Sequence, residues 1–480
     1  MKSHPIFNTA ILVLFVLTAG NINTSGQQIE YSVPLGDNIQ NTDFDIVGYC
    51  HNHLLIFKSS YNEYNMVLYN DSMNIIDQVP LKFLPKETVK EDFVNLGNKV
   101  IMIYQYTHKK DIYCESVQLN EDAVPLSTPV LIDKTIHPEQ VFGDKAYAAI
   151  HSDDKSKIMI FEMLGKEDSL EYHIHTFLYD SAMRILNTGA VNLSYAVLDE
   201  KPVRFKVADD GNLYFLMGNK TNPSDPYYQR MKIYIKPAGR DTLLSDTVSS
   251  GGHLLKSNPV LKIDELHQKL WVSAFGYDNK IHNIDRLMLW TFSMDSLKLL
   301  KYNTVLLTDS IKKNMESKDE GLHETFNDYN LNQLVVGNDE TTLLIAEEKY
   351  TDINNVTHHN DMAFFTINSS GVLTGIQKIK KDQGSDLSSV YASYMMVNIG
   401  HALHFLMNKS HHVFRFLNNY RYLLTDYRYG DNQKLEQMPT LRGLANKYFW
   451  APRYGVQVSR SEVVVPCTIG SSLLFAKIAY

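Results

Sequence analysis

The sequence predicts an all-β protein made of repeated four-stranded units that close into a ring. Three observations carry this prediction. A turn that leads into an alternating apolar run recurs seven times, a second hairpin pattern follows each copy, and the two ends of the chain each hold part of one more unit. The 29 tyrosines and 21 phenylalanines agree with it, because aromatic residues favour half-buried strands.

The first anchor of each unit is a polar turn before an apolar run. Asn, Asp, Gly and other polar residues at these points suit tight hairpins. The turns are centred near residues 52, 98, 144, 211, 268, 339 and 400.

The second anchor follows after a variable loop, where one apolar run reaches a turn and another leaves it. Clear copies are 66–76, 175–186 and 287–300, and weaker copies are 116–126, 233–244, 363–373 and 413–424. Each unit is therefore expected to hold four antiparallel strands, which in the first unit cover about 44–50, 54–59, 65–70 and 74–81. The third unit fits worst, because 158–164 and 172–179 both resemble strands and could add a hairpin.

The eighth unit stops before its last strand. Residues 455–459, 463–468 and 473–479 would supply three strands, and residues 29–35 would supply the outer one. Tetrads repeating at about this period resemble the blades of a β-propeller, which implies one domain over residues 27–480. We expect eight blades, with seven as the alternative if one weak copy is an insertion. The repeat carries neither a Trp-Asp signature nor a Gly-rich kelch signature, so the sequence does not assign the chain to a named propeller family. The polar stretches 310–326 and 435–448 could hold short helices.

Residues 1–26 predict a secretory signal peptide. Lys2 is their single charge, and the apolar run from Ala10 to Ala19 is too short to span a bilayer. Thr24 and Gly26 suit a cleavage site. We expect an exported protein, periplasmic or extracellular, without a membrane span; an uncleaved anchor is the alternative.

The net charge and the cysteine content argue against some classes of protein. A net charge of -8 without a basic cluster argues against nucleic-acid binding. The pairs Lys109-Lys110, Lys312-Lys313 and Lys380-Lys381 are interpreted as solvated edges. Cys50, Cys114 and Cys467 are interpreted as small buried hydrophobes, although a Cys50–Cys467 disulfide is conceivable if the ends meet. The sequence leaves the oligomeric state open.

The loops between second and third strands share one face with the connections between units, because strand direction alternates. These loops are rich in Tyr and His, whose rings bury area and form hydrogen bonds. We interpret this face as a binding surface for a glycan, peptide or protein, and the alternative is loop tyrosines without a function. The predicted ligand-binding residues are Tyr106, His108, Tyr227, Tyr228, Tyr277, His282, Tyr350, His358, His359, His411 and His412.

Catalytic motifs are missing. The chain has no GxSxG, GxxxxGK[ST] or GxGxxG sequence, and no HExxH, paired CxxC or DxDxDG sequence. We therefore expect a non-enzymatic binding protein with no catalytic residue, cofactor or metal site. The alternative function is a carbohydrate-active hydrolase or lyase, which would need two carboxylates about 5–10 Å apart near the ring axis. Asp153-Asp154, Asp209-Asp210 and Glu347-Glu348 are the carboxylate pairs available to it.

An Asp followed by Ser or Thr and an apolar residue recurs in the chain. The tripeptide resembles the acceptor of a bacterial O-glycosylation system of secreted proteins. The alternative is simple turn chemistry, because Asp-Ser and Asp-Thr form turns well. The positions are Asp71, Asp168, Asp180, Asp241, Asp246, Asp295 and Asp309.

Overall fold

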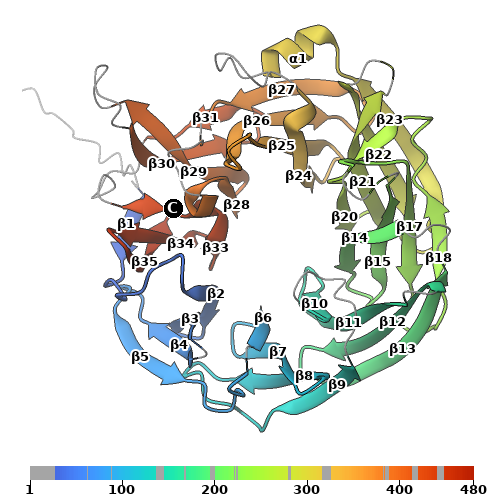
Figure 1. The fold of residues 1–480 in the computed structure, drawn as a ribbon. Coiled ribbons are helices and arrows are strands. Elements are labelled where there is room, and N and C mark those ends of the chain that lie inside the picture. The colour runs from blue at the N-terminus through green and yellow to red at the C-terminus, as the bar shows by residue number, and fades with distance from the viewer. Residues whose placement is uncertain are drawn as a thin grey trace, which may run out of the picture.

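The computed structural model shows a single β-propeller of eight antiparallel blades arranged in a ring (Figure 1). It describes residues 27–480 apart from 62, 88, 137–144, 167–168, 195–199, 221, 223–224, 279, 281–282, 316–325, 382, 384–388, 413–419 and 440–447. The expected signal peptide and His282 lie outside the described residues. Within the described residues, no helix is long and apolar enough to cross a membrane.

Blades 1–4 each contain four strands in sequence order from the axis outwards. Their bounds are β2 (Asp43–Cys50), β3 (His53–Ser60), β4 (Glu63–Tyr69) and β5 (Ile75–Pro80); β6 (Val89–Asn95), β7 (Val100–His108), β8 (Asp111–Leu119) and β9 (Val130–Ile136); β10 (Tyr147–His151), β11 (Lys157–Lys166), β12 (Ser169–Asp180) and β13 (Ile185–Ser194); and β14 (Glu200–Val207), β15 (Leu213–Asn219), β17 (Arg230–Lys236) and β18 (Leu244–Thr247).

Blades 5–7 follow the same order, and blade 8 combines both ends of the chain. Their bounds are β20 (Val260–Asp264), β21 (Lys269–Asp278), β22 (Asn283–Ser293) and β23 (Leu299–Leu306); β24 (Tyr329–Val336), β25 (Thr342–Thr351), β26 (Thr357–Ile367) and β27 (Leu373–Ile379); β28 (Tyr394–Ile399), β29 (Ala402–His412), β30 (Tyr420–Tyr429) and β31 (Leu435–Gln437); and β32 (Phe449–Trp450), β33 (Val456–Gln457), β34 (Glu462–Ile469), β35 (Ser472–Ala479) and β1 (Gln28–Tyr31).

The ring closes as the sequence predicts. β1 pairs antiparallel with β35, with Gln28 opposite Ala479 and Tyr31 opposite Ala476. Hydrogen bonds from the backbone N–H groups of Ser32 and Leu35 to β35 continue the contact beyond the strand. The last blade therefore has no unpaired outer edge at β35.

Two local assignments were wrong. The run after residue 145 is the innermost strand of blade 3, β10, and not its second strand. Consequently 158–164 and 172–179 are the ordinary second and third strands, and blade 3 has no extra hairpin. In blade 7 the third-to-fourth hairpin turn lies at 430–434, because β30 pairs with β31. The helix expected over 435–448 begins with strand β31, and its remainder lies mostly outside the described residues.

Apolar side chains fill the spaces between neighbouring blades. Eight buried apolar clusters among the described residues correspond one to one with the eight interfaces between blades. Blades are therefore buried on both faces, which is why second strands such as β15 are buried throughout. Cys50, Cys114 and Cys467 are free and buried in these clusters, so Cys50 and Cys467 are not joined.

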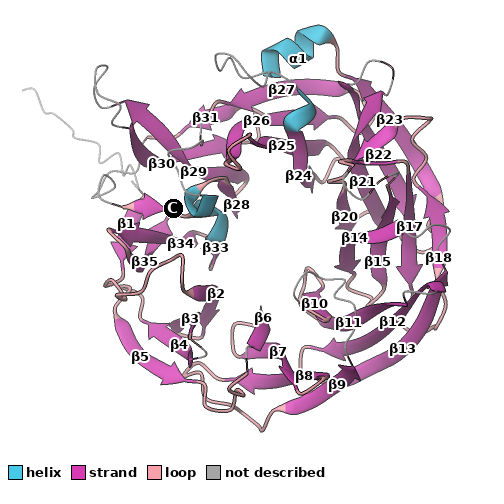
Figure 2. Ribbon diagram, in the orientation of Figure 1, coloured by secondary structure: helices cyan, strands magenta, loops and turns pink. Residues whose placement is uncertain are grey.

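Helical segments are few and lie in connections (Figure 2). They are α1 (Asp309–Met315), η1 (Phe326–Asp328), η2 (Ser389–Tyr391) and η4 (Pro452–Tyr454). α1 overlaps the start of the polar stretch 310–326 that was expected to hold a helix.

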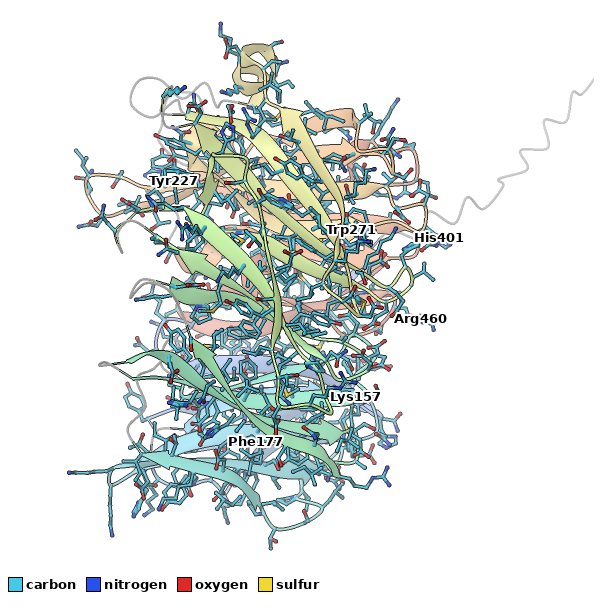
Figure 3. The ribbon with its side chains drawn as sticks, turned by 90° about the vertical axis from the view of Figure 1, so that its right-hand side faces the viewer. Lys157, Phe177, Tyr227, Trp271, His401 and Arg460 are labelled. Atoms are coloured by element: carbon cyan, nitrogen blue, oxygen red, sulfur yellow. The ribbon has the colours of Figure 1, made fainter. Side chains whose placement is uncertain are left out.

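The ring has two faces with different loops. We call the face with the connections between blades and the second-to-third-strand loops the loop face, and the face with the other hairpin turns the turn face. Figure 3 shows Tyr227 at the loop face and Lys157, His401 and Arg460 towards the turn face. The turns between third and fourth strands hold Asp71, Asp180 and Asp295, as turn chemistry predicts. The carboxylate of Asp180, for example, accepts hydrogen bonds from the backbone N–H groups of Ala182 and Arg184, each at 2.9 Å.

Candidate functional site

The candidate site is a cavity of about 520 Å³ at the axis, near the loop face. The inner strands β24 and β28 supply much of its wall, because their first residues follow the blade connections on that face. The ends of β25 and β26, the turn η4 and Arg204 of β14 complete it. A second space of about 540 Å³ shares Arg204, Asn332, Gln333 and Met396 with the first and continues along the inner strands past Lys206 and Lys262.

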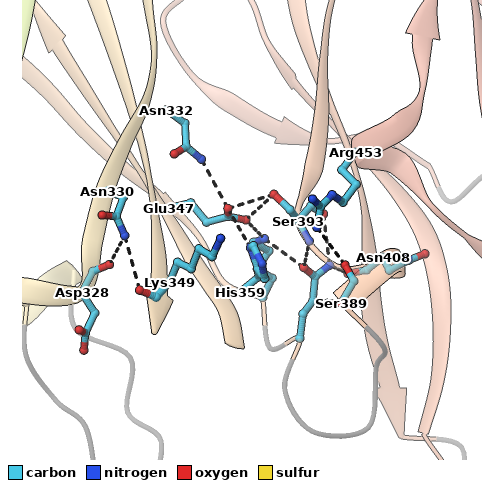
Figure 4. Close-up of polar contacts among 12 residues, drawn as sticks. Asp328, Asn330, Asn332, Glu347, Lys349, His359, Ser389, Ser393, Asn408 and Arg453 are labelled. Carbon is cyan, nitrogen blue, oxygen red and sulfur yellow. Dashed lines mark hydrogen bonds and ion pairs between the residues drawn. The ribbon is translucent and has the colours of Figure 1, made fainter. Parts of the chain in front are cut away.

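Glu347 forms the centre of a buried ionic network in the cavity wall (Figure 4). Lys381 Nζ forms an ion pair with its Oε1, and His359 Nδ1 lies 3.1 Å from Oε2. The hydroxyl of Ser393 lies 3.0 Å from both carboxylate oxygens. Burial alone would raise the pKa of Glu347, but Lys381 and His359 outweigh it and lower this pKa to about 2.

This network corrects the interpretation of Lys381 as a solvated residue. Its ammonium group is fully buried, touches Glu347, and lies 3.1 Å from Gln383 Oε1. Burial lowers the pKa of Lys381, and Glu347 opposes that shift. The charge of Glu347 is thus already neutralised inside the wall, which leaves little negative charge for the cavity.

Local backbone geometry positions Ser393 for this contact. Its φ of 72° is in the left-handed region, which costs a non-glycine residue free energy of roughly 1 kcal/mol or more. The Ser393 N–H donates to Gln383 Oε1 at 2.7 Å, and Gln383 in turn donates to the carbonyl of Asn408 at 2.7 Å. Buried amides thus hold the turn that enters β28.

Three cationic side chains line the same cavity without carboxylate partners. Arg204, Lys349 and Arg453 are exposed in it, and no described carboxylate forms an ion pair with any of them. Arg453 donates instead to the carbonyl of Ser389 at 3.1 Å. Amides surround these cations: Asn258, Asn330, Asn332 and Gln333. The arrangement suits an anionic ligand that also offers many hydrogen-bonding groups.

The amide groups are held in place by the strands. Asn258 Nδ2 donates to Asn330 Oδ1 at 3.0 Å, and Asn330 Nδ2 donates to the carbonyl of Asp328 at 2.9 Å. Asn332 Nδ2 lies 3.4 Å from Glu347 Oε2. Since these contacts link blades 5 and 6, the polar wall is largely formed before any ligand binds.

The predicted loop-face residues fall into separate groups. Tyr227 stacks on Tyr277 with ring centroids 4.1 Å apart, because the short strand β16 (Tyr227–Tyr228) crosses from blade 4 to pair with β19 (Leu254–Lys256), which pairs with β21. Tyr350 stacks on His358 with centroids 4.7 Å apart. These two pairs are half-buried and lie at the loop face.

The other predicted residues have different surroundings. Tyr106 stacks on Tyr113, and its hydroxyl donates to Glu115 at 3.1 Å; His108 lies 2.9 Å from Glu87. Tyr228 is buried against Gly218, and His359 belongs to the Glu347 network in the axial cavity. His411 and His412 end strand β29.

Acidic side chains from inner strands of blades 1 and 2 form a different electrostatic environment. Burial raises the pKa of Asp45 on β2 to about 6 and that of Glu91 on β6 to about 7. The charges of Asp43 and Asp92 add to both pKa shifts, the charge of Asp45 adds to that of Glu91, and Lys145 opposes both shifts. The inner strands thus carry acids in blades 1 and 2, whereas β14 of blade 4 carries the exposed cations Arg204 and Lys206.

Comparisons with known proteins assign no family to this chain. No family model and no curated protein sequence matches this chain. Among solved structures, the WD40 domain of SCAP from fission yeast is 10% identical, covers 94% of this chain and 98% of its own, and has a TM-score of 0.39. The Nup133 β-propeller domain of Vanderwaltozyma polyspora is 9% identical over 81% of this chain and 99% of its own, with a TM-score of 0.41. The polysaccharide lyase Uly1 is 9% identical over 81% and 89%, with a TM-score of 0.42.

Proposed function

We propose that the protein is a non-enzymatic binding module that takes an acidic glycan into its axial cavity from the loop face. The observation that carries the proposal is the set of three exposed cations, Arg204, Lys349 and Arg453, in a wall whose one carboxylate among the described residues, Glu347, is already paired. Carboxylate or sulfate groups would pair with the cations, and hydroxyl groups would meet the surrounding amides. The N-terminal segment supports a further proposal, that binding takes place after export.

The stacked loop-face rings extend the proposed binding surface. Sugar rings pack well on aromatic side chains, which bury area and keep a polar edge. Tyr227–Tyr277 and Tyr350–His358 come from blades that also contribute to the cavity or flank it. A glycan longer than the cavity would leave through this face and pass these rings.

A direct test compares an acidic and a neutral oligosaccharide of equal length, tetragalacturonate and maltotetraose, by isothermal titration calorimetry. We expect the acidic one to bind at least tenfold more tightly, with affinity falling as salt is added. Arg204→Gln and Lys349→Gln should each weaken binding several-fold. Arg460→Gln, an exposed cation on the turn face, is the matched control and should bind like the unmodified chain. Equal affinity for both sugars would refute the proposal.

A second candidate function rests on a specific observation. Asp45 and Glu91 have pKa values raised to about 6 and about 7, as a proton donor for glycoside cleavage would need. This supports a carbohydrate-active hydrolase or lyase acting at the blade 1 and blade 2 side of the axis. In that case Glu91→Gln should abolish the release of reducing ends from the acidic glycan, and Asp77→Asn, on the exposed outer strand of blade 1, should not. An unmodified chain that releases no reducing ends would exclude this function.

A further inference from the structure

A second polar cluster lies far from the axial cavity, between blades 2 and 3. It contains Asp133 of β9, Glu162 of β11 and His175 of β12, and one possible ligand atom from each lies within 4.8 Å of the others. Glu162 and His175 are directly opposite each other in the antiparallel pair, and Oε1 and Nδ1 are 2.9 Å apart. The outer strand of one blade thus faces the middle strands of the next.

Glu162 is a buried carboxylate with too few partners. Its side chain is 2% exposed, and no described residue donates a hydrogen bond of ordinary geometry to Oε2. A buried charged oxygen without a donor is costly. A cation between Glu162 and Asp133 would supply the partner that Oε2 lacks.

The surroundings suit a metal ion. The Tyr147 hydroxyl donates to Asp133 Oδ2 at 3.1 Å, and Tyr147 also lies directly across the strand pair from Glu162. A phenol that orients a ligating carboxylate is a usual outer partner of a metal site. The His175 side chain is 41% exposed, which gives an ion a route from solvent.

We propose that Asp133, Glu162 and His175 bind a divalent transition-metal cation, for which Zn²⁺ is the probe. Imidazole nitrogen and carboxylate oxygen are both ligands that such ions take, with ligand distances of about 2.0–2.2 Å. Three protein ligands leave a position for water, and the ion would join blades 2 and 3. This departs from the sequence expectation of no metal site, because no motif links residues so far apart.

The structure offers a useful contrast. His253, Asp278 and Asp285 also approach one another within 4.8 Å, at the loop-face end of blade 5. There, Arg286 donates to both oxygens of Asp285, at 2.9 and 2.6 Å. A fixed cation thus already balances that buried carboxylate, so we propose no metal for this second cluster.

The test uses the full chain treated with EDTA and dialysed, then titrated with ZnCl₂ by calorimetry. We expect one Zn²⁺ per chain and a higher melting temperature in its presence. Glu162→Gln and His175→Ala should each lower the affinity at least tenfold and remove the thermal shift. His173→Ala is the matched control, because His173 lies two residues away on β12 and outside the cluster. It should bind Zn²⁺ like the unmodified chain.

Two further measurements separate binding from folding. Metal-free Glu162→Gln should melt at or above the temperature of the metal-free parent, because the amide removes a buried charge. Co²⁺ should give a visible absorption band with the parent and with His173→Ala, and a much weaker band with His175→Ala. No stoichiometric binding by the parent, or equal binding by all variants, would overturn the proposal.

Discussion

Gln28 and Ala479 lie directly opposite each other on neighbouring antiparallel strands, although almost the whole chain separates them in sequence. This pairing makes the ring continuous through hydrogen bonds between its two ends. Tyr31 of the same strand stacks on Tyr448 with centroids 4.5 Å apart, and the N–H of Phe475 donates to the hydroxyl of Ser32 at 3.0 Å. Side-chain contacts therefore help to close the ring, together with the backbone hydrogen bonds between β1 and β35.

Deleting Gln27–Gly36 should destabilise the entire ring. The change exposes the edge of β35 and removes the Tyr31 contact, so we expect a loss of about 3 kcal/mol or more in the free energy of unfolding. Urea unfolding followed by fluorescence measures this loss, and hydrogen exchange should show faster exchange in blades 1 and 8 alike. Gln28→Ala, at an exposed position of the same strand, is the control. Faster exchange confined to β35 would contradict the prediction.

Lys381→Met should be one of the most damaging single substitutions in the cavity wall. It leaves the buried charge of Glu347 without its ion-pair partner, and breaking such a pair costs about 3–5 kcal/mol. The double variant Glu347→Gln/Lys381→Met should recover much of that loss, because neither charge remains. Urea unfolding of the two single variants and the double variant measures the coupling. Additive effects would show that the two groups act independently.

The same ion pair predicts how acid affects stability. The pKa of Glu347 is lowered to about 2 in the folded protein, below its ordinary 4.5. Its stabilising contribution is therefore complete above about pH 4.5 and is lost as the pH falls towards 2. The difference in unfolding free energy between the parent and Glu347→Gln should shrink across this window. A difference that stays constant from pH 5 to pH 2.5 would contradict it.

Glu91 predicts the opposite pH dependence. Burial and the charge of Asp45 raise its pKa to about 7 in the fold, so deprotonation is harder there than in the unfolded chain. The folded state binds more protons between about pH 4.5 and 7, and stability from this group falls as the pH rises through that window. Glu91→Gln should raise the melting temperature at pH 8 and change it little at pH 4.5. Thermal unfolding of the parent and of Glu91→Gln, measured at pH 8 and at pH 4.5, tests this prediction.

The loop-face rings predict a selective loss of glycan affinity. Changing Tyr227 and Tyr277 together to Ala removes the stacked pair while leaving the buried Tyr228 in the core. We expect affinity for a long acidic oligosaccharide to fall about tenfold, with a smaller effect on a short one that fits the axial cavity. Tyr61→Ala, a 93% exposed ring in the corresponding loop of blade 1, is the control. Unchanged affinity for the long oligosaccharide would place these rings outside the binding path, and equal losses for both lengths would contradict the selective effect.

Much of the architecture was predictable from local pattern. Alternating apolar residues and turn residues gave the strands of blade 1 to within a few residues, and the unfinished unit at 455–479 led correctly to the strand near residue 29. The failures came where local signals were equivalent. The run before Asp153 looks like any strand, so its place as first or second in the blade depends on which strand it pairs with, and pairing is not local.

The site residues were less predictable for the same reason. The Glu347-Glu348 and Lys380-Lys381 pairs were visible in the sequence, but nothing in it shows that Glu347 and Lys381 meet in one wall.

The sequence by itself determined the all-β class, the tetrads and the closure between chain ends, because each follows from short-range periodicity. The tertiary structure alone decided which charges converge. Arg204, Lys349 and Arg453 come from three different blades, and Asp133, Glu162 and His175 come from two, so their meeting depends on how the ring packs. Side-chain burial and pairing then set which charges are neutralised and which remain available to a ligand.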